Sequence, residues 1–168
     1  MKNLSLIAAI GKNNELGLDN RLIWHIKEDL SFYRSMTIGK NIIMGRKTFE
    51  SMPAGALKKR TPFVLSRTIE LDKFCDVNSY NNIEELLNYI ESSEEEFVVV
   101  GGAVIYKEFM PYVDTMYLTQ ILEYAGADTY FPKFDIKDWN IEIMDNYCKE
   151  EIPYIRKKYI RKKYIRKR

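Results

Sequence analysis

The sequence predicts an α/β domain built around a mostly parallel β-sheet. The chain has 168 residues, the size of one compact domain. Short, almost wholly apolar segments alternate with helical segments, and strands that are apolar on both faces are typical of parallel sheets covered by helices on each side. The last expected strands follow one another without an intervening helix, so we expect the sheet to end antiparallel.

The expected strands are short apolar runs bounded by polar residues. Residues 4–10 form such a run, and residues 11–21 follow as a polar loop that holds two glycines and three asparagines. The expected strands are residues 4–10, 41–45, 62–66, 97–100, 115–121 and 139–144.

The expected helices have apolar residues spaced three or four positions apart. Pro53 and Gly55 end the second of them, Asn82 is suited to cap the third, and Pro111 ends the fourth. The expected helices are residues 27–37, 47–52, 83–90 and 103–110.

The formal charge of +2 hides an uneven distribution. Residues 154–168 hold nine Lys or Arg and no acidic residue, so the other 153 residues hold 17 basic and 24 acidic ones, a net charge of −7. An acidic body argues against a nucleic-acid-binding protein, and only the tail could serve that purpose. No apolar run approaches the ~18–20 residues of a membrane span.

The basic tail repeats every five residues, starting at Tyr154, Tyr159 and Tyr164. A five-residue period fits neither the alternation of a strand nor one face of a helix. Counted from Pro153 and Tyr154, we expect the closing strand to need residues only to about Tyr164. Tyrosines among cations also allow a second class of function, RNA binding through phosphate contacts and stacking. This alternative stays open at the level of the sequence.

The cysteines and the histidine indicate no metal site. Cys75 and Cys148 lack metal-ligand spacing, and His25, the only histidine, is expected on the surface. No serine-nucleophile motif is present. Two thiols and an apolar start too short for a signal peptide favour a reduced, cytoplasmic setting.

Asp29 is the strongest candidate for chemistry. On a helical wheel of ~100° per residue it falls inside the apolar arc, between Tyr33 and Met36. A carboxylate there is costly unless something pairs with it. Glu28, on the polar side, already serves the helix dipole, so a ligand-binding or catalytic role is favoured for Asp29.

Three expected strands end in groups that suit anions. Gly101-Gly102 and the Gly45-Arg46-Lys47-Thr48 segment each lead from a strand into a helix, and Ser66-Arg67 adds a further cation. No GxGxxG or Walker motif is present. Together these groups indicate a ligand with several phosphates, such as a nucleotide cofactor, and hence a redox enzyme whose cofactor does the hard chemistry.

These residues closely resemble the bacterial dihydrofolate reductase family, over about residues 3–153. The most specific shared motifs are Met-Gly-Arg-Lys-Thr at residues 44–48, Trp24 five positions before Asp29, and Gly-Gly-x₃-Tyr ending at Tyr106. The resemblance implies an eight-stranded, mostly parallel sheet with an antiparallel C-terminal edge and about four helices, forming one domain over residues 1–168. It also implies NADPH-dependent reduction of 7,8-dihydrofolate to tetrahydrofolate for one-carbon metabolism, antifolate binding, a cytoplasmic location and a monomer.

The resemblance also implies roles for individual residues. Asp29 matches the acid that binds the pterin and promotes protonation of N5, and Arg60 matches the arginine that binds the substrate's glutamate. The implied catalytic residues are Asp29, Trp24, Leu30 and Thr119. The implied substrate-binding residues are Ile7, Ala8, Asp29, Leu30, Tyr33, Arg60, Val100, Tyr106 and Thr119.

For NADPH, the resemblance implies that the loop at residues 11–21 closes over the nicotinamide and that the Gly101–Gly102 peptide is cis. The implied cofactor-binding residues are Ala9, Leu16, Gly17, Asn20, Gly45, Arg46, Lys47, Thr48, Leu65, Ser66, Arg67, Gly101, Gly102, Ala103, Val104, Ile105 and Tyr106.

The chain departs from the family at two positions: Ile23 stands where the family has proline, and Tyr33 where phenylalanine is common. A related alternative is another reductase of similar fold, such as the one of riboflavin synthesis. Asp29, Trp24 and Arg60 argue against it, because they match residues that serve the folate head and tail.

Overall fold

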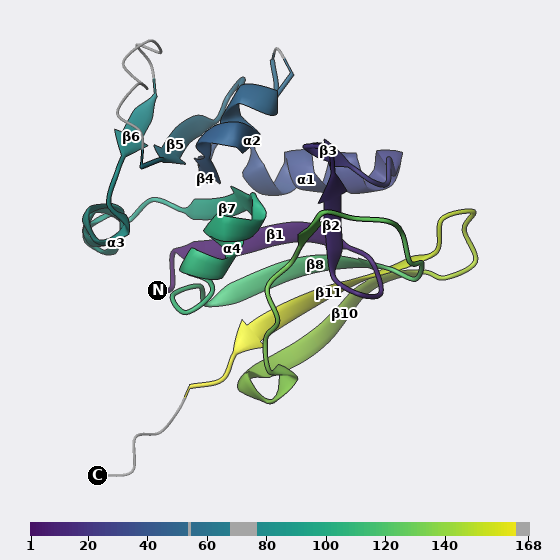
Figure 1. Ribbon diagram of the computed structural model, residues 1–168. Coiled ribbons are helices and arrows are strands. Elements are labelled where there is room, and N and C mark those ends of the chain that lie inside the picture. Colours follow the sequence, from purple (N-terminus) through teal and green to yellow (C-terminus); the bar gives the residue numbers. More distant parts are fainter. Residues whose placement is uncertain (54, 68–76, 164–168) are drawn as a thin grey trace.

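A computed structural model describes residues 1–53, 55–67 and 77–163, and its centre is an eight-stranded sheet (Figure 1). In chain order its strands are β1 (Leu4–Ile10), β4 (Asn41–Gly45), β5 (Thr61–Leu65), β6 (Asn78–Tyr80), β7 (Phe97–Gly101), β8 (Thr115–Ile121), β10 (Trp139–Tyr147) and β11 (Tyr154–Arg161). Their order across the sheet is β10-β11-β8-β1-β7-β4-β5-β6. All neighbours from β8 to β6 pair parallel, whereas β11 pairs antiparallel with β8 and β10. The predicted fold class is confirmed.

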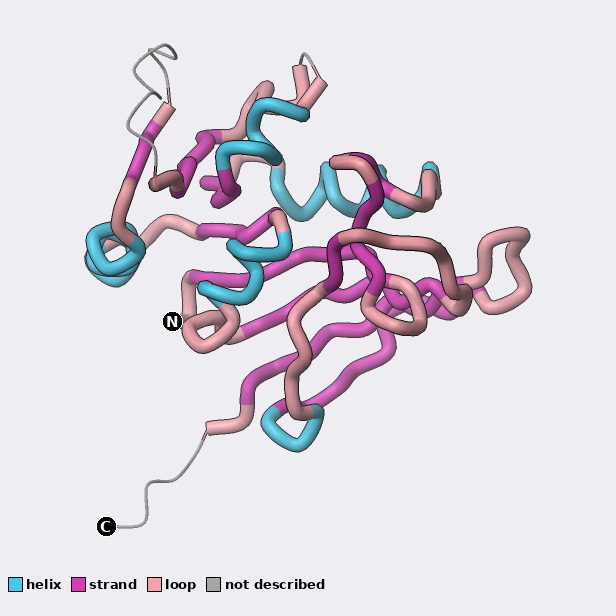
Figure 2. The backbone as a smooth tube through the Cα atoms, viewed as in Figure 1, coloured by secondary structure: helices cyan, strands magenta, loops and turns pink. Residues whose placement is uncertain are grey.

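Four α-helices accompany the sheet: α1 (Lys27–Thr37), α2 (Arg46–Ser51), α3 (Ile83–Ser92) and α4 (Ala103–Phe109). Asn82 caps α3 as predicted, since its side chain accepts a hydrogen bond from the Glu84 amide at 2.8 Å. After α4, the described chain forms strands and loops with one short 3₁₀ turn, η2 (Ile136–Asp138) (Figure 2). No helix within the described ranges is long and apolar enough to cross a membrane.

A second, three-stranded sheet stands where the sequence predicts only a polar loop. It consists of β2 (Glu15–Leu18), β3 (Arg21–Leu22) and β9 (Thr129–Tyr130). Asp19 and Asn20 turn the chain between β2 and β3 with φ values of 51° and 58°, which short polar side chains tolerate. The loop prediction for residues 11–21 is therefore wrong in part, because pairing with a segment more than 100 positions away orders it.

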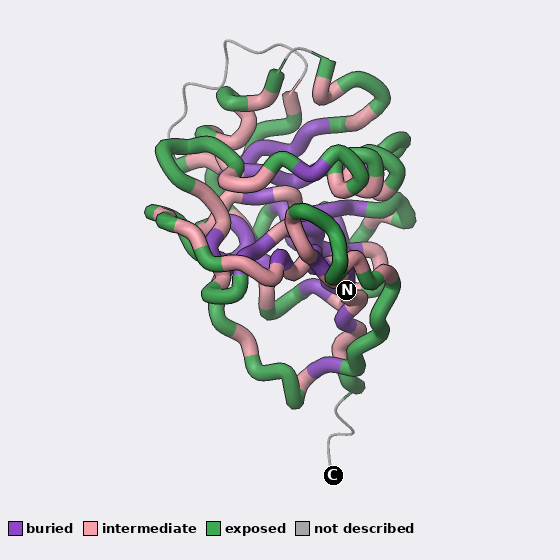
Figure 3. Tube along the Cα trace, turned by 90° about the vertical axis from the view of Figure 1, so that its right-hand side faces the viewer, coloured by how far each residue is buried: buried purple, intermediate pink, exposed green. Residues whose placement is uncertain are grey.

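The core lies on both faces of the main sheet. The side chains of β1, β4 and β7 are almost fully buried, and α3 and α4 cover one face with Leu86, Ile90 and Phe109. Figure 3 shows these buried segments in the middle of the molecule, with exposed residues around them. Each fully buried aliphatic or aromatic side chain contributes about 1.5–3 kcal/mol. This packing holds the parallel strands in a fixed register and so fixes the edge where their carboxyl ends meet.

The first part of the basic repeat forms the closing strand, β11, which ends at Arg161, within the expected limit near Tyr164. Successive residues of a strand face opposite sides, so an odd period places equivalent residues on opposite faces. Tyr154 packs with Ile26 and Ile121 on one face, whereas Tyr159 joins the main core on the other, 5.4 Å from the Phe134 ring. Both tyrosines are only 2% exposed. Because both faces of β11 are covered, the period of five is compatible with a buried strand.

The arginines of the repeat follow the same rule. Arg156 lies over the Phe32 ring of α1, 3.9 Å from its centroid, and Arg161 lies over the Trp139 ring at 4.2 Å. The first repeat therefore places its arginine inside the molecule, and Arg156 is not part of a basic surface for RNA. The third repeat, residues 164–168, lies outside the described residues.

Candidate active site

The predicted site residues gather where the parallel strands end. In the sheet, Ala9 pairs with Thr119, Met44 with Gly101, and Gly45 with Leu65. These strand ends share one edge, which is where α/β sheets bind ligands. The packing of the core therefore brings together the strand-end residues predicted for substrate and for cofactor.

Asp29 lies in the first turn of α1, above the end of β8. The Thr119 hydroxyl donates a hydrogen bond to its Oδ1 at 2.6 Å. The Asp29 side chain is 20% exposed, and neighbouring Leu30 is 40% exposed although it is apolar. A partly buried carboxylate beside an exposed apolar side chain is the arrangement that a flat, polar heterocycle would cover.

Arg156 belongs to this site, and sequence reasoning missed it. Its Nη2 lies 3.0 Å from Asp29 Oδ1, and its register partner on β8 is Thr119. All the site residues predicted from the sequence lie before Phe131, so this contact was not among the predictions. The signal was present in the sequence, because a carboxylate in an apolar arc needs a partner, and a cation in a closing strand can supply one.

Two tyrosines line the region behind Asp29. The Tyr106 hydroxyl lies 2.8 Å from the Ile7 carbonyl and 2.9 Å from that of Val100, so it ties β1 to β7. Burial raises the pKa of Tyr106 and also that of Tyr33, although the charge of Arg60 opposes the rise at Tyr33. Both side chains are therefore neutral phenols at physiological pH.

Arg60 is held in place by three hydrogen bonds. Its Nε donates to Thr37 Oγ1 at 2.8 Å, its Nη1 to the Lys58 carbonyl at 2.8 Å, and its Nη2 to the Arg34 carbonyl at 3.1 Å. A guanidinium has five N–H donors, so one donor remains on each terminal nitrogen. Arg60 is thus a preformed fork for a carboxylate.

A narrow cradle forms between α2 and α4. The Gly101–Gly102 peptide is cis, as predicted, and a Cβ at Gly102 would lie 3.4 Å from Thr48 Oγ1. A Cβ at Gly45 would lie 3.1 Å from the Ile105 side chain. The glycines therefore let the two helix starts approach closely, and the first N–H groups of a helix have no partner within it.

Three cations surround this cradle. Arg46 pairs with Glu50 at 3.1 Å, and Arg67 lies 4.0 Å from Glu108 while its side chain stays 92% exposed. Lys47 is exposed at the start of α2. Weakly held cations beside close-packed glycines fit a ligand with several phosphates.

The segment around β2 borders the same edge. Trp24 Nε1 donates to Glu123 at 3.2 Å, and Leu16 packs against the main core. Gly17 pairs with Thr129, and Asn20 is exposed in the turn. His25 is exposed, as expected, and takes no part in this arrangement.

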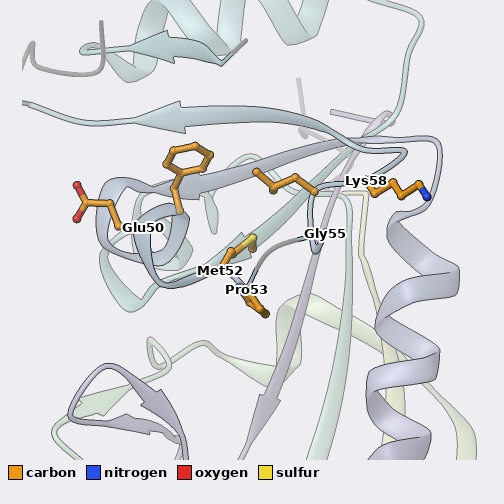
Figure 4. Close-up of a pocket in the computed structure, with 7 residues that line it drawn as sticks. Glu50, Met52, Pro53, Gly55 and Lys58 are labelled. Carbon is orange, nitrogen blue, oxygen red and sulfur yellow. The ribbon is translucent and has the colours of Figure 1, made fainter. Parts of the chain in front are cut away.

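A hollow of about 370 Å³ lies beside the site rather than in it (Figure 4). Its lining comes from α2 and the segment that leads towards Arg60, and Asp29 is not part of it. The lining residues are Phe49, Glu50, Met52, Pro53, Gly55, Leu57 and Lys58. The hydrogen-bonded groups around Asp29, rather than this hollow, define the chemistry.

Comparison with known proteins agrees with this geometry. The dihydrofolate reductase family profile matches residues 3–162. The dihydrofolate reductase of Haemophilus influenzae is 40% identical over 147 residues, covering 88% of this chain and 89% of that protein. That of Bacillus subtilis is 36% identical over 148 residues, covering 88% and 86%.

One solved structure is similar to this chain over nearly its whole length. The dihydrofolate reductase from Enterococcus faecalis, complexed with NADP(H) and RAB-propyl, superposes with a TM-score of 0.83 at 31% identity. The match covers 95% of this chain and 96% of that one.

The fold and the strand-end site define an NADPH-dependent oxidoreductase, and the chain belongs to the dihydrofolate reductase family. Its activity is the reduction of 7,8-dihydrofolate to tetrahydrofolate, its cofactor is NADPH, and it binds dihydrofolate and antifolate inhibitors. This family membership excludes the related reductase of riboflavin synthesis.

Proposed function

We propose that Asp29 binds the pterin ring of dihydrofolate and promotes protonation of its N5. The support is its position: a partly buried carboxylate, bonded through Oδ1 to Thr119, at the carboxyl edge of the sheet. A carboxylate accepts hydrogen bonds from the pterin's amino group and ring N–H. An acid held there supports protonation of the ring through an ordered water.

The remaining residues that contact the substrate lie along the same carboxyl edge of the sheet. Ile7, Ala8 and Val100 come from β1 and β7, and Leu30 and Tyr33 come from α1, so apolar walls flank the carboxylate. Arg60 binds the α-carboxylate of the glutamate with its two remaining donors. Trp24 orders water near Asp29.

The cradle between α2 and α4 binds NADPH. Lys47, Thr48 and the Gly101–Ile105 turn hold its phosphates, while Arg46, Ser66 and Arg67 face the ribose 2′-phosphate; Gly45, Leu65 and Tyr106 complete the cradle. Ala9 and Leu16, with Gly17 and Asn20, cover the nicotinamide side and exclude water. When bound, NADPH supplies the hydride for reduction.

The whole chain, residues 1–168, acts as one reductase domain and as a cytoplasmic monomer. The continuous eight-stranded sheet, in which the C-terminal β11 lies next to β8, supports the single domain. Gel filtration with light scattering measures the monomer directly, and a mass of two chains contradicts it.

The test of the proposed role of Asp29 is a matched pair of variants on one helix. Asp29→Asn removes the partly buried acid, and Glu28→Gln removes the exposed acid beside it. We expect Asp29→Asn to lower reductase activity at pH 7 by about 10²–10⁴-fold, the usual contribution of one acid, and Glu28→Gln to leave it nearly unchanged. Activity of Asp29→Asn within about threefold of the unchanged chain contradicts the role.

A further inference from the structure

The buried guanidinium of Arg156 forms an ion pair with the Asp29 carboxylate. Arg156 is a residue of β11 with 5% of its side chain exposed. Its Nη2 bonds Asp29 Oδ1 at 3.0 Å, its Nη1 bonds Asp145 Oδ2 at 2.5 Å, and its Nε bonds Thr119 Oγ1 at 3.3 Å. Each guanidinium nitrogen is thus engaged, and the Phe32 ring covers its face.

The hydrogen-bond directions in this cluster are determined. Arg156 Nε can only donate, so the Thr119 hydroxyl accepts that bond and donates its own proton to Asp29 Oδ1. Oδ1 therefore accepts two hydrogen bonds. Both of the side-chain hydrogen bonds to Asp29 from the described residues end on Oδ1, and neither ends on Oδ2. One oxygen is anchored to the protein, and the other is left for a ligand.

We propose that Arg156 is a positioning residue for the reduction, which anchors Asp29 Oδ1 and thereby presents Oδ2 to the pterin. This role rests on the proposed function of Asp29. Asp145, a residue of β10, holds Arg156 in turn. Its carboxylate bonds Nη1 of the guanidinium, and its side chain is 35% exposed. Two hydrogen bonds to one oxygen, from Arg156 Nη2 and from the Thr119 hydroxyl, restrict the rotation of the Asp29 carboxylate more than either bond alone.

The charges fit such a role. Burial alone would lower the pKa of Arg156, but its bonds and charge interactions with Asp29 and Asp145 outweigh burial, and the pKa is raised. The guanidinium therefore stays charged throughout the working range.

Several other ionisable groups lie on the elements packed around Asp29. Burial raises the pKa values of Tyr33 from α1, Tyr106 from α4 and Tyr154 from β11, so these three side chains stay neutral. The charged side chains on these elements include Glu28 of α1 and Asp145 of β10. Among the described residues, Arg156 is the cation that an ion pair joins to Asp29.

The test compares two arginines of one strand, the buried Arg156 and the half-buried Arg161. Arg156→Met removes the contact with Asp29, and Arg161→Met removes the equivalent residue of the next repeat, which donates to the Val113 and Met110 carbonyls on the other face. We expect Arg156→Met to lower the plateau of kcat/KM by about tenfold to a hundredfold, as expected for a lost charge-assisted bond. Arg161→Met, although less stable, should keep the plateau per folded molecule.

The conservative variant separates positioning from a structural role. Arg156→Lys keeps a cation at this place but cannot bond Asp29, Thr119 and Asp145 together through one planar group, so we expect it to recover only part of the lost kcat/KM. Asp145→Asn loosens the guanidinium without emptying a buried position, and should have little further effect in the Arg156→Met background.

A readout without catalysis distinguishes this proposal from the role of Asp29 in the reaction. Carboxyl ¹³C relaxation measures how freely the Asp29 side chain moves in the ligand-free protein. Greater mobility of this carboxyl group in Arg156→Met, and not in Arg161→Met, supports the anchoring of Asp29 by Arg156 even if Asp29→Asn proves active. Unchanged mobility and an unchanged kcat/KM plateau in Arg156→Met and Asp145→Asn would overturn the proposal.

Discussion

Replacing Arg60 by lysine tests how the site recognises the tail of its substrate. Three of the five N–H donors of Arg60 are used within the described chain, and one remains on each terminal nitrogen. Lysine keeps the positive charge but cannot present two parallel donors. The exchange therefore removes about one charge-assisted hydrogen bond to the glutamate α-carboxylate.

Such a bond contributes about 1.5–3 kcal/mol, and the lower end applies here because Arg60 is partly exposed. About 1.4 kcal/mol corresponds to a factor of ten, so kcat/KM for dihydrofolate should fall about tenfold, mainly through KM. The loss should vanish with dihydropteroate, the same substrate without its glutamate.

The assay is steady-state oxidation of NADPH with each of the two substrates. Lys59→Gln serves as the control, because it removes a neighbouring exposed cation and leaves the three anchoring bonds of Arg60 in place. Equal losses of Arg60→Lys on both substrates would refute the reasoning, since the fork would then act on the fold or the pterin rather than on the glutamate.

Three further changes address the cofactor, the sheet and the tail. Arg67→Ala should reduce the preference for NADPH over NADH by about tenfold, because the arginine is exposed and free to meet a 2′-phosphate; equal preferences before and after the change would count against this role. Tyr106→Phe should lower the free energy of unfolding by about 1–3 kcal/mol, since the Ile7 and Val100 carbonyls lose their buried donor; a melting curve unchanged within error would contradict this. Ending the chain at Lys163 should leave kcat and KM nearly unchanged, because β11 ends at Arg161; insoluble protein would show that residues 164–168 belong to the fold.

The central strands could be predicted because their own residues are mostly apolar, which indicates a buried strand. Residues 4–10, 41–45 and 115–121 are apolar runs with polar ends, and the structure gives them the same bounds. The start of α2 moved by one residue, from Lys47 to Arg46, which is the usual uncertainty at a helix end.

The small sheet was not predictable from local composition. β2 and β9 are only four and two residues long, too short to show a strand pattern, and they pair with each other across more than 100 positions. The same distance explains why Arg156 was missed. The helical wheel identified Asp29 as a carboxylate in need of a partner, but the partner lies 127 positions further on, in a strand whose five-residue period does not show which side chains face the site.

The most direct test of the central claim is the absorbance of NADPH mixed with the purified chain, before and after addition of dihydrofolate. We expect no loss of NADPH until dihydrofolate is added, and then oxidation of one NADPH for each tetrahydrofolate formed, at a rate that Asp29→Asn lowers by about 10²–10⁴-fold. Oxidation of NADPH that does not depend on dihydrofolate, or a chain that binds NADPH and leaves dihydrofolate unreduced, would contradict the claim.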